Sequence, residues 1–334
     1  MRIGLAGAGR IGAFHASTLV ALEDVDQVVL SDAFPAAAAR LAEENGYESS
    51  PDLDDLLSRV DALVITTSTH GHAPTLRSAL AAKMPTFCEK PVAATLAETI
   101  GMVDLVVEAD VPVQVGFQRR FDAGYRRARA AVVSGELGFL HTVRVNTHDQ
   151  SPPPAAYIPT SGGLFRDCSI HDFDVLRFVT GREVVSVYAV DANKGASFFT
   201  EGGDIDTGAA VLTLDDGTLV TASATRYNGG GHDVRMEVMG SEGTVGVGYD
   251  DSLAVRSVES GVDYPRGPQR WSFMERFLPA YRTELAAFCD VVAGRAETPC
   301  TVVDALEAFR VAEACEVSRA TGRPVAMSEI EGAA

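Results

Sequence analysis

The feature that most constrains the fold is a glycine-rich turn between a strand and a helix near the N-terminus. Residues 2–6 read as a short buried strand, and Gly7-Ala8-Gly9-Arg10-Ile11-Gly12 follows before a helical run to about Ala21. In such a turn the first glycine permits the bend, the second lets the backbone approach a pyrophosphate, and the third lets helix and strand pack closely. The helix N-terminus offers N–H groups and a positive dipole end to phosphates. The pattern predicts a dinucleotide site that includes Gly7, Gly9, Arg10, Ile11 and Gly12.

An acidic residue at the end of the next strand supports this prediction. The strand expected over 27–30 ends in Ser31-Asp32, and Asp32 lies 20 residues after Gly12, where an acid can hold the ribose hydroxyls. Its charge would oppose a 2′-phosphate, so we expect NAD as the cofactor. Arg10 could reach such a phosphate and leaves NADP use open, although we interpret it as an exposed cation at the helix start.

Strands and helices alternate through the first third of the chain, which predicts a parallel, doubly wound sheet. The expected strands are 27–30, 60–66, 85–88 and 112–116, and the expected helices are 35–45, 51–58, 70–83 and 95–109. Ligands bind at the carboxyl edge of such a sheet. Thr66, Thr67 and Ser68 end one strand there, and Glu89-Lys90-Pro91 ends the next. We expect Thr66, Thr67, Ser68, Glu89 and Lys90 to contact the cofactor, with Lys90 beside the nicotinamide position. A lysine before proline is more often a surface turn, but here it would point into the cleft.

The second part of the chain has a different pattern. From residue 139 onward, apolar residues alternate in segments separated by turns such as Asp215-Asp216-Gly217. The segments are 140–146, 184–190, 209–214, 219–226, 234–239 and 244–247. They predict an α+β domain with a large, open, mostly antiparallel sheet. We therefore expect a Rossmann domain over 1–118 and a substrate-binding and oligomerisation domain over 119–334, whose helix at 303–321 can pack back on the first domain.

A loop-to-helix transition in the second part carries candidate catalytic residues. If the helix begins near Ser169, then Asp167 and His171 stand four apart at its start, and Asp174 follows three later on the same stripe. Three apolar residues on another stripe are expected to face a core: Ile170, Phe173 and Leu176. An imidazole and carboxylates aimed at one point favour an oriented general base. The alternative is a capped helix with solvated polar residues.

Composition excludes several classes of function. The chain has 334 residues, a net charge of −18 and no apolar run of membrane-spanning length, so we expect neither nucleic acid nor membrane as a partner. The cysteines are five, with no C-x-x-C pair, which favours a reducing cytoplasm and argues against a structural metal site. We therefore predict a cytoplasmic protein without a bound metal.

Three motifs together resemble the Gfo/Idh/MocA oxidoreductases, and most closely their inositol 2-dehydrogenases. The motifs are Gly-x-Gly-x-x-Gly with His15, Glu89-Lys90-Pro91, and Gly162-Gly163 followed by Asp167 and His171. The segments 113–122 and 276–281 also resemble family segments, and the similarity runs from residue 1 to about 320. The motifs are specific for the superfamily and less so for the substrate.

The resemblance implies roles for individual residues. Lys90, Asp167 and His171 would form the catalytic trio, and His72 would lie near the cofactor. The positions implied to line the inositol pocket, besides the trio, are Arg119, His148, Asp174 and His232. The pattern departs from the family at Cys168, where a threonine is usual, and at His232, where a tyrosine is usual.

The resulting functional prediction is NAD-dependent oxidation of a secondary hydroxyl on a cyclic polyol or sugar, with myo-inositol as the favoured substrate. Alternatives on the same scaffold are oxidation of scyllo-inositol, an aldose or an anhydro-sugar, and NAD-dependent glycoside hydrolysis. A non-enzymatic NAD-binding regulator is a further alternative, which retention of the trio opposes. The resemblance also implies a homo-oligomer, commonly a tetramer.

Overall fold

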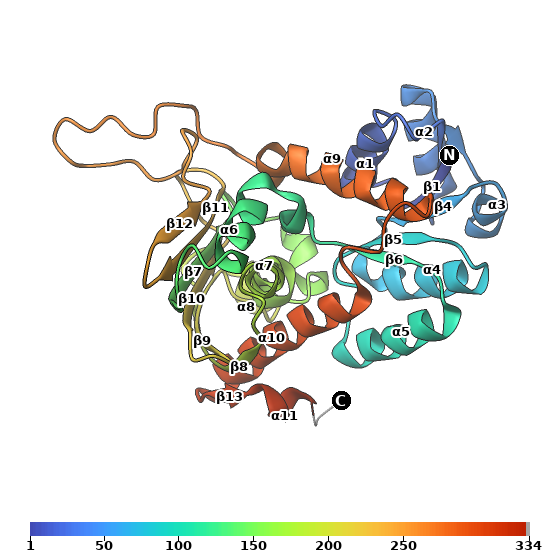
Figure 1. Ribbon diagram of the computed structural model, residues 1–334. Coiled ribbons are helices and arrows are strands. Elements are labelled where there is room, and N and C mark those ends of the chain that lie inside the picture. Colours follow the sequence, from blue (N-terminus) through green and yellow to red (C-terminus); the bar gives the residue numbers. More distant parts are fainter. Residues whose placement is uncertain (332–334) are drawn as a thin grey trace. The chain divides into compact units, whose positions relative to one another are not determined.

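The computed structural model describes residues 1–331, and the chain forms two compact units, each built on one sheet (Figure 1). The first unit comprises Met1–Phe121 and Pro279–Leu306, and the second comprises Asp122–Leu278 and the chain from Glu307 onward. The domain boundary expected at residue 118 did not foresee that the chain returns to the first unit over Pro279–Leu306. Of the helix expected over 303–321, only the part up to Leu306 is grouped with the first unit.

The first unit contains the predicted doubly wound sheet. Its six strands are all parallel and lie in the order β3-β2-β1-β4-β5-β6. The strands are β1 (Arg2–Ala6), β2 (Gln27–Ser31), β3 (Glu48–Ser49), β4 (Ala62–Ile65), β5 (Thr86–Glu89) and β6 (Val113–Gly116). The helices are α1 (Arg10–Leu19), α2 (Pro35–Asn45), α3 (Leu53–Ser58), α4 (Thr69–Ala81) and α5 (Leu96–Ala109), followed by the 3-10 helix η1 (Gln118–Phe121). The strand order reverses direction between β1 and β4, and ligands of such sheets bind at the carboxyl ends of the two strands at this point.

The returning segment belongs to the first unit because it completes that unit's core. Leu285 and Phe288 of helix α9 (Phe273–Val292) are fully buried in one cluster with Ile3, Leu5 and Leu30 of β1 and β2. Burial of each large apolar side chain contributes about 1.5–3 kcal/mol. Figure 1 shows α1 and α9 on one side of this sheet and α4 and α5 on the other.

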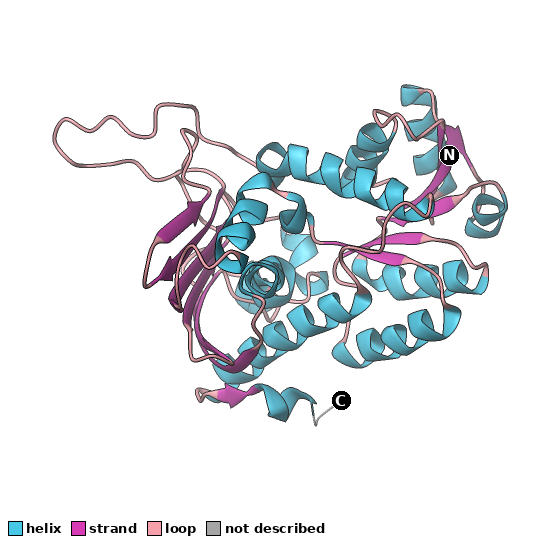
Figure 2. Cartoon of the chain, viewed as in Figure 1, coloured by secondary structure: helices cyan, strands magenta, loops and turns pink. Residues whose placement is uncertain are grey.

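The second unit contains the predicted mostly antiparallel sheet, in the order β12-β11-β7-β10-β9-β8-β13. Every adjacent pair is antiparallel except β7 and β10, which are parallel. The strands are β7 (Leu140–His148), β8 (Val184–Ala192), β9 (Thr207–Leu214), β10 (Leu219–Thr225), β11 (Asp233–Gly240), β12 (Thr244–Val247) and β13 (Val325–Ala326). The remaining helices are α6 (Ala123–Val133), α7 (Ile170–Thr180), α8 (Phe198–Glu201), α10 (Val302–Thr321) and α11 (Met327–Glu331), with a 3-10 helix η2 (Ala155–Thr160). Figure 2 shows helices on one face of this sheet and a long loop over residues 248–272.

The helix expected to begin near Ser169 begins earlier. A π-helical turn η3 (Phe165–Ser169) runs directly into α7. It starts upstream because the Leu164 amide donates to Asp204 Oδ1 at 2.9 Å and the Asp167 amide donates to the Gly163 carbonyl at 2.8 Å. The apolar stripe of Ile170, Phe173 and Leu176 is fully buried, as expected. Asp167 therefore lies in a π-helical turn, a conformation that is frequent at functional sites.

Candidate active site

The glycine turn after β1 has the backbone geometry of a phosphate cradle. Gly7 has a φ of +109°, a backbone conformation that residues with a side chain rarely adopt. A Cβ atom at Gly12 would lie 1.8 Å from the Gly7 carbonyl oxygen, so α1 packs directly against the turn. At Gly9 an added Cβ would meet no described atom within 4 Å, so this side of the turn is open to a ligand. A phosphate group can therefore approach the backbone at Gly9 and the N-terminus of α1 that follows it.

This packing predicts that Gly12→Ala lowers both the melting temperature and the affinity for NADH, because the new methyl group forces α1 away from β1. Gly101→Ala in α5 is the matched control, since its Cβ meets no described atom within 4 Å. Alanine is favoured over glycine inside a helix by about 0.5–1 kcal/mol, so the control should be slightly stabilised. Thermal unfolding with and without NADH measures both effects. A Gly12→Ala protein with wild-type stability and NADH affinity would contradict this packing.

Asp32 closes the turn from the end of β2. Its Oδ2 accepts a hydrogen bond from the Ala8 amide at 2.7 Å, and its Oδ1 accepts one from the Phe34 amide at 2.8 Å. Each oxygen keeps a second lone pair for a ribose hydroxyl. The half-buried carboxylate is therefore already oriented toward the glycine turn, while Arg10 is exposed at the start of α1.

The loop after β4 is tied both to the glycine turn and to the loop after β5. Thr66 Oγ1 donates to the Gly7 carbonyl at 2.8 Å. His72 is buried, with Nδ1 2.6 Å from the Pro91 carbonyl and Nε2 3.1 Å from the Thr67 carbonyl. Burial lowers the pKa of His72, and the Pro91 carbonyl only partly offsets this. Both partners are carbonyl oxygens, so a ring nitrogen of His72 that carries a proton donates it to one of them.

Lys90 leaves the carboxyl end of β5 with its backbone fixed on both sides. Its amide donates to Glu89 Oε2 at 3.2 Å, and Glu89 Oε1 lies 2.7 Å from Nε2 of the fully buried His15. On the other side, the cis Lys90–Pro91 peptide leads to the Pro91 carbonyl that His72 contacts. The half-buried lysine side chain therefore starts from a rigid support at the sheet edge.

In the second unit, both carboxylate oxygens of Asp167 are held by other side chains. Oδ2 accepts a hydrogen bond from Arg226 Nη2 at 2.6 Å, and Oδ1 accepts one from the Tyr157 hydroxyl at 3.0 Å. His171 follows four residues later on the same continuous helical segment and is half-buried. A fixed carboxylate one turn before an imidazole suits a general base whose protonated form must be oriented and stabilised.

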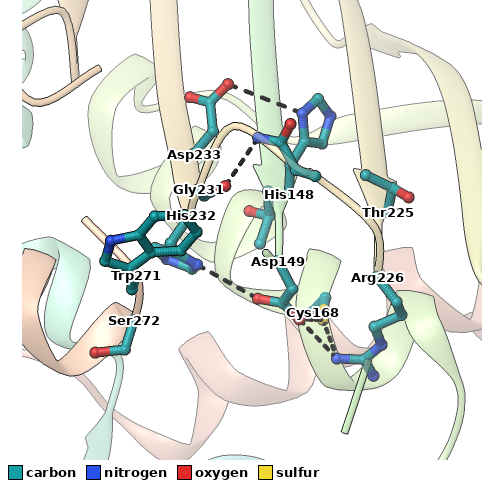
Figure 3. A network of polar contacts seen from close by, with 12 residues as sticks. His148, Asp149, Cys168, Thr225, Arg226, Gly231, His232, Asp233, Trp271 and Ser272 are labelled. Carbon is teal, nitrogen blue, oxygen red and sulfur yellow. Dashed lines mark hydrogen bonds and ion pairs between the residues drawn. The ribbon is translucent and has the colours of Figure 1, made fainter. Parts of the chain in front are cut away.

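Arg226, which binds Asp167, belongs to a polar network with Asp149, Cys168 and His232 (Figure 3). Arg226 also donates to Asp149 Oδ2 at 3.0 Å, and its Nη1 lies 2.7 Å from Cys168 Sγ. On the far side, Asp149 Oδ1 lies 3.4 Å from His232 Nδ1. Although burial raises the pKa of Asp149, the contacts with His232 and Arg226 outweigh it and hold that pKa below its ordinary value. The network therefore links His232 to Asp167 through an ionised carboxylate and a guanidinium.

His148 is directed elsewhere. Its Nε2 lies 3.0 Å from Ser223 Oγ and its Nδ1 lies 3.9 Å from the Asp233 carboxylate. The preceding residue, Thr147, donates to Asp172 of α7. Because successive side chains of a strand point to opposite faces, His148 lies on the sheet face away from α7. Burial lowers the pKa of His148, and Asp233 offsets this only in part.

The other two predicted pocket residues are buried in different units. Asp174 is fully buried in α7 of the second unit, and Arg119 is 2% exposed in η1 of the first. Within the second unit, the structure therefore connects Asp167 with His232, while His148 and Asp233 form a separate group.

No motif in the sequence indicates Tyr157, Asp149 or Arg226 as site residues. Asp149 and Arg226 each directly follow a strand, and their strands, β7 and β10, are parallel neighbours that end at the same edge. The Asp149 amide donates to the Thr225 carbonyl at 2.9 Å, which fixes that relation. The sequence pattern within a strand does not reveal which strand it pairs with. The only local sign of the Asp149–Arg226 ion pair is that each strand is followed by a charged residue.

The part of the chain that the structure describes lacks two kinds of feature. Over residues 1–331, no three His, Cys, Asp or Glu side chains are grouped in a way that could hold a metal ion. In the same residues, we find no helix with both the length and the apolar character needed to cross a lipid bilayer.

Comparison with protein families matches both parts of the chain. Residues 1–117 match the model of an oxidoreductase family with an NAD-binding Rossmann fold, and residues 125–246 match the model of the GFO/IDH/MocA C-terminal domain. The first match confirms the NAD-binding fold predicted from the glycine turn. Together the two matches confirm the family resemblance that the three motifs carry.

Known relatives match nearly the whole chain. Myo-inositol dehydrogenase Hyg17 of Streptomyces leeuwenhoekii is 38% identical over 331 residues, covering 98% of this chain and 100% of that protein. The structure of a myo-inositol dehydrogenase from Corynebacterium glutamicum is 33% identical, with a TM-score of 0.88 over 98% of each chain. The structure of scyllo-inositol dehydrogenase from Lactobacillus casei with bound NAD(H) and scyllo-inositol is 28% identical, with a TM-score of 0.88 over 98% of this chain and 99% of that one.

Proposed function

This chain belongs to the GFO/IDH/MocA family of NAD-dependent oxidoreductases, and we propose that it oxidises a secondary hydroxyl of a cyclic polyol, with myo-inositol as its substrate. The observation that carries the proposal is the match of nearly the whole chain to proteins named as inositol dehydrogenases, at 33–38% identity. Lys90, Asp167 and His171 all stand in the motifs that identify the family.

The residues of the first unit fit NAD. The open side of Gly9 admits a pyrophosphate, and Asp32 is oriented for the ribose. We propose that Thr66, Thr67, Ser68, His72 and Glu89 complete the cofactor site at the sheet edge. When bound, NAD accepts a hydride from the substrate carbon.

We propose that the chain's own residues manage the proton and the charge. His171 takes the proton of the substrate hydroxyl, and Asp167 orients the imidazole and stabilises its protonated form. The Lys90 ammonium donates a hydrogen bond to the same oxygen and stabilises its developing alkoxide charge. We propose that Arg119, Asp174 and His232 select the ring by binding its other hydroxyls. His148, which lies on the sheet face away from α7, is not part of this proposal.

A substrate panel tests this proposal. The purified protein is incubated with NAD and, separately, with myo-inositol, scyllo-inositol, glucose or levoglucosan, while NADH absorbance is recorded. We expect the highest kcat/KM with myo-inositol. A higher kcat/KM with scyllo-inositol would identify that isomer as the substrate instead. Cys168 and His232 could account for such a preference, because both differ from the residues usual at these positions. An aryl glycoside is incubated with NAD in the same way, and release of its aryl group without net NADH would indicate a glycosidase instead.

The Asp32 geometry predicts the coenzyme preference. Asp32→Ala is expected to raise kcat/KM with NADP by about tenfold, because a carboxylate close to a 2′-phosphate costs roughly 1–4 kcal/mol. The same change should lower kcat/KM with NAD, since Ala8 loses its hydrogen-bond acceptor. Glu43→Ala, at an exposed position of α2, is the control. An unchanged ratio of the two coenzymes in Asp32→Ala would remove Asp32 from the ribose site.

We also propose that the protein is a cytoplasmic homotetramer. All five cysteines are buried and none of them forms a disulfide bond, which suits a reducing compartment. The open face of the second sheet exposes Val190, Val211 and Tyr188, and Tyr188 lies opposite Val211 across the β8–β9 pair. An exposed apolar sheet face supports association between subunits. Sedimentation equilibrium checks the assembly, and a monomer at all concentrations would contradict it.

A further inference from the structure

One guanidinium in the second unit is shared between two carboxylates, and no motif of the sequence accounts for it. Arg226 is 3% exposed and directly follows β10. Its Nη2 binds Asp167, and its Nη1 binds Asp149 and contacts Cys168 Sγ. Burial alone would disfavour its charge, but Cys168, Asp167 and Asp149 together keep the pKa of Arg226 well above its ordinary value. The side chain is therefore a permanent buried cation.

The backbone leaves this cation little freedom. β10 pairs in parallel with β7, so Arg226 and Asp149 leave the sheet at the same edge. The Arg226 amide donates to the Asp206 carbonyl at 2.8 Å, and the Asp149 carbonyl accepts from the Asn228 amide at 2.8 Å. Both ends of the Arg226–Asp149 ion pair thus have fixed backbones. A planar guanidinium held in this way presents its remaining N–H groups in a fixed direction.

The geometry points to Arg226 as a positioning residue for the reaction: it holds the Asp167 carboxylate in one orientation and limits how strongly that carboxylate stabilises a protonated His171. The inference rests on the proposed function, in which His171 is the base. A carboxylate with no cation beside it would raise the pKa of a neighbouring imidazole, and its pairing with Arg226 reduces that effect. His171 then remains unprotonated, and so competent as a base, at lower pH.

Other groups around Asp167 complete its environment. The Tyr157 hydroxyl from η2 binds the second carboxylate oxygen, and the Cys168 thiol lies beside the guanidinium. Across the guanidinium stand Asp149 and, beyond it, His232. His232 Nε2 is buried and has no hydrogen-bond partner among the described residues. Among these groups Arg226 is permanently cationic and contacts Asp167 directly, while Asp149 on its other side offsets part of its charge.

The test compares Arg226→Met and Arg226→Lys with the wild type. The pH profile of kcat/KM, kcat, KM and the affinity for NADH are measured for each protein. We expect Arg226→Met to lower kcat by about tenfold or more, to move the acid limb of the profile to higher pH, and to leave NADH affinity unchanged. Arg226→Lys should retain part of the rate because it keeps the charge. Guanidinium salt should partly restore the rate of Arg226→Ala.

Arg144→Met is the matched control, because Arg144 pairs with Glu237 on the same sheet but is 61% exposed. A folded Arg226→Met protein with the wild-type acid limb, whether or not its melting temperature falls, would overturn the inference. If the wild type oxidises no polyol in the panel, the proposed function fails first. The inference is then judged by NMR titration of His171: a higher pKa in Arg226→Met supports it, and an unchanged pKa overturns it.

Discussion

Lys90→Ala is expected to reduce kcat for polyol oxidation by about 10²-fold or more, while the protein still binds NADH. The reason is that the ammonium acts on the charge that develops on the substrate oxygen, and removal of one such donor costs catalysis more than binding. Steady-state kinetics and NADH fluorescence titration measure the two quantities separately. The fold should survive, since the Lys90 backbone is supported by Glu89 and by the contact of His72 with Pro91.

Lys194→Ala is the control for this variant, because Lys194 is an exposed lysine of the second unit that has no part in the proposed mechanism. Its kinetics should match those of the wild type. A Lys90→Ala protein that keeps most of its turnover would remove the lysine from the mechanism, although the NAD site would stand.

His171→Ala is expected to lower kcat by roughly 10²–10⁴-fold, the range that a positioned general base contributes. The loss should be smaller at high pH, where hydroxide can replace the missing base. The measurement is kcat across the pH range with saturating NAD. His141→Ala is the control, since His141 is an exposed histidine of β7. A His171→Ala enzyme with an unchanged pH profile would show that another group accepts the proton.

The first unit could be predicted almost completely from the sequence. The turn at Gly7 and the close packing at Gly12 follow from local backbone geometry, and the structure shows both, while Gly9 borders open space. Asp32 likewise stands where a fixed spacing after the turn requires it. Such features are local, so a linear pattern contains them. The return of Leu285 and Phe288 into the same core is a contact between distant segments and has no local sign.

For the second unit, the type of sheet could be predicted from the sequence, but the order in which its strands pair could not. Alternating apolar residues indicated the strands and the open sheet, yet the parallel pairing of β7 with β10 depends on the whole sheet. That pairing brings Arg226 to Asp149 and Asp167, so the residues that hold the Asp167 carboxylate could not be identified from the sequence. The prediction that the helix begins near Ser169 was also wrong. Its earlier start depends on the hydrogen bond from the Leu164 amide to Asp204, a residue 40 positions away that a local pattern does not reveal.

The most direct test of the proposed reaction follows the hydrogen that is transferred from the ring carbon to NAD. The protein is incubated with NAD and myo-inositol deuterated on its ring carbons, and the reduced nucleotide is examined by mass spectrometry. The account predicts one deuterium in each NADH formed, since the hydride moves from the ring carbon to the cofactor while the hydroxyl proton leaves through the protein. Reduced nucleotide without deuterium, or no reduced nucleotide from myo-inositol under conditions in which NAD binds, would contradict it.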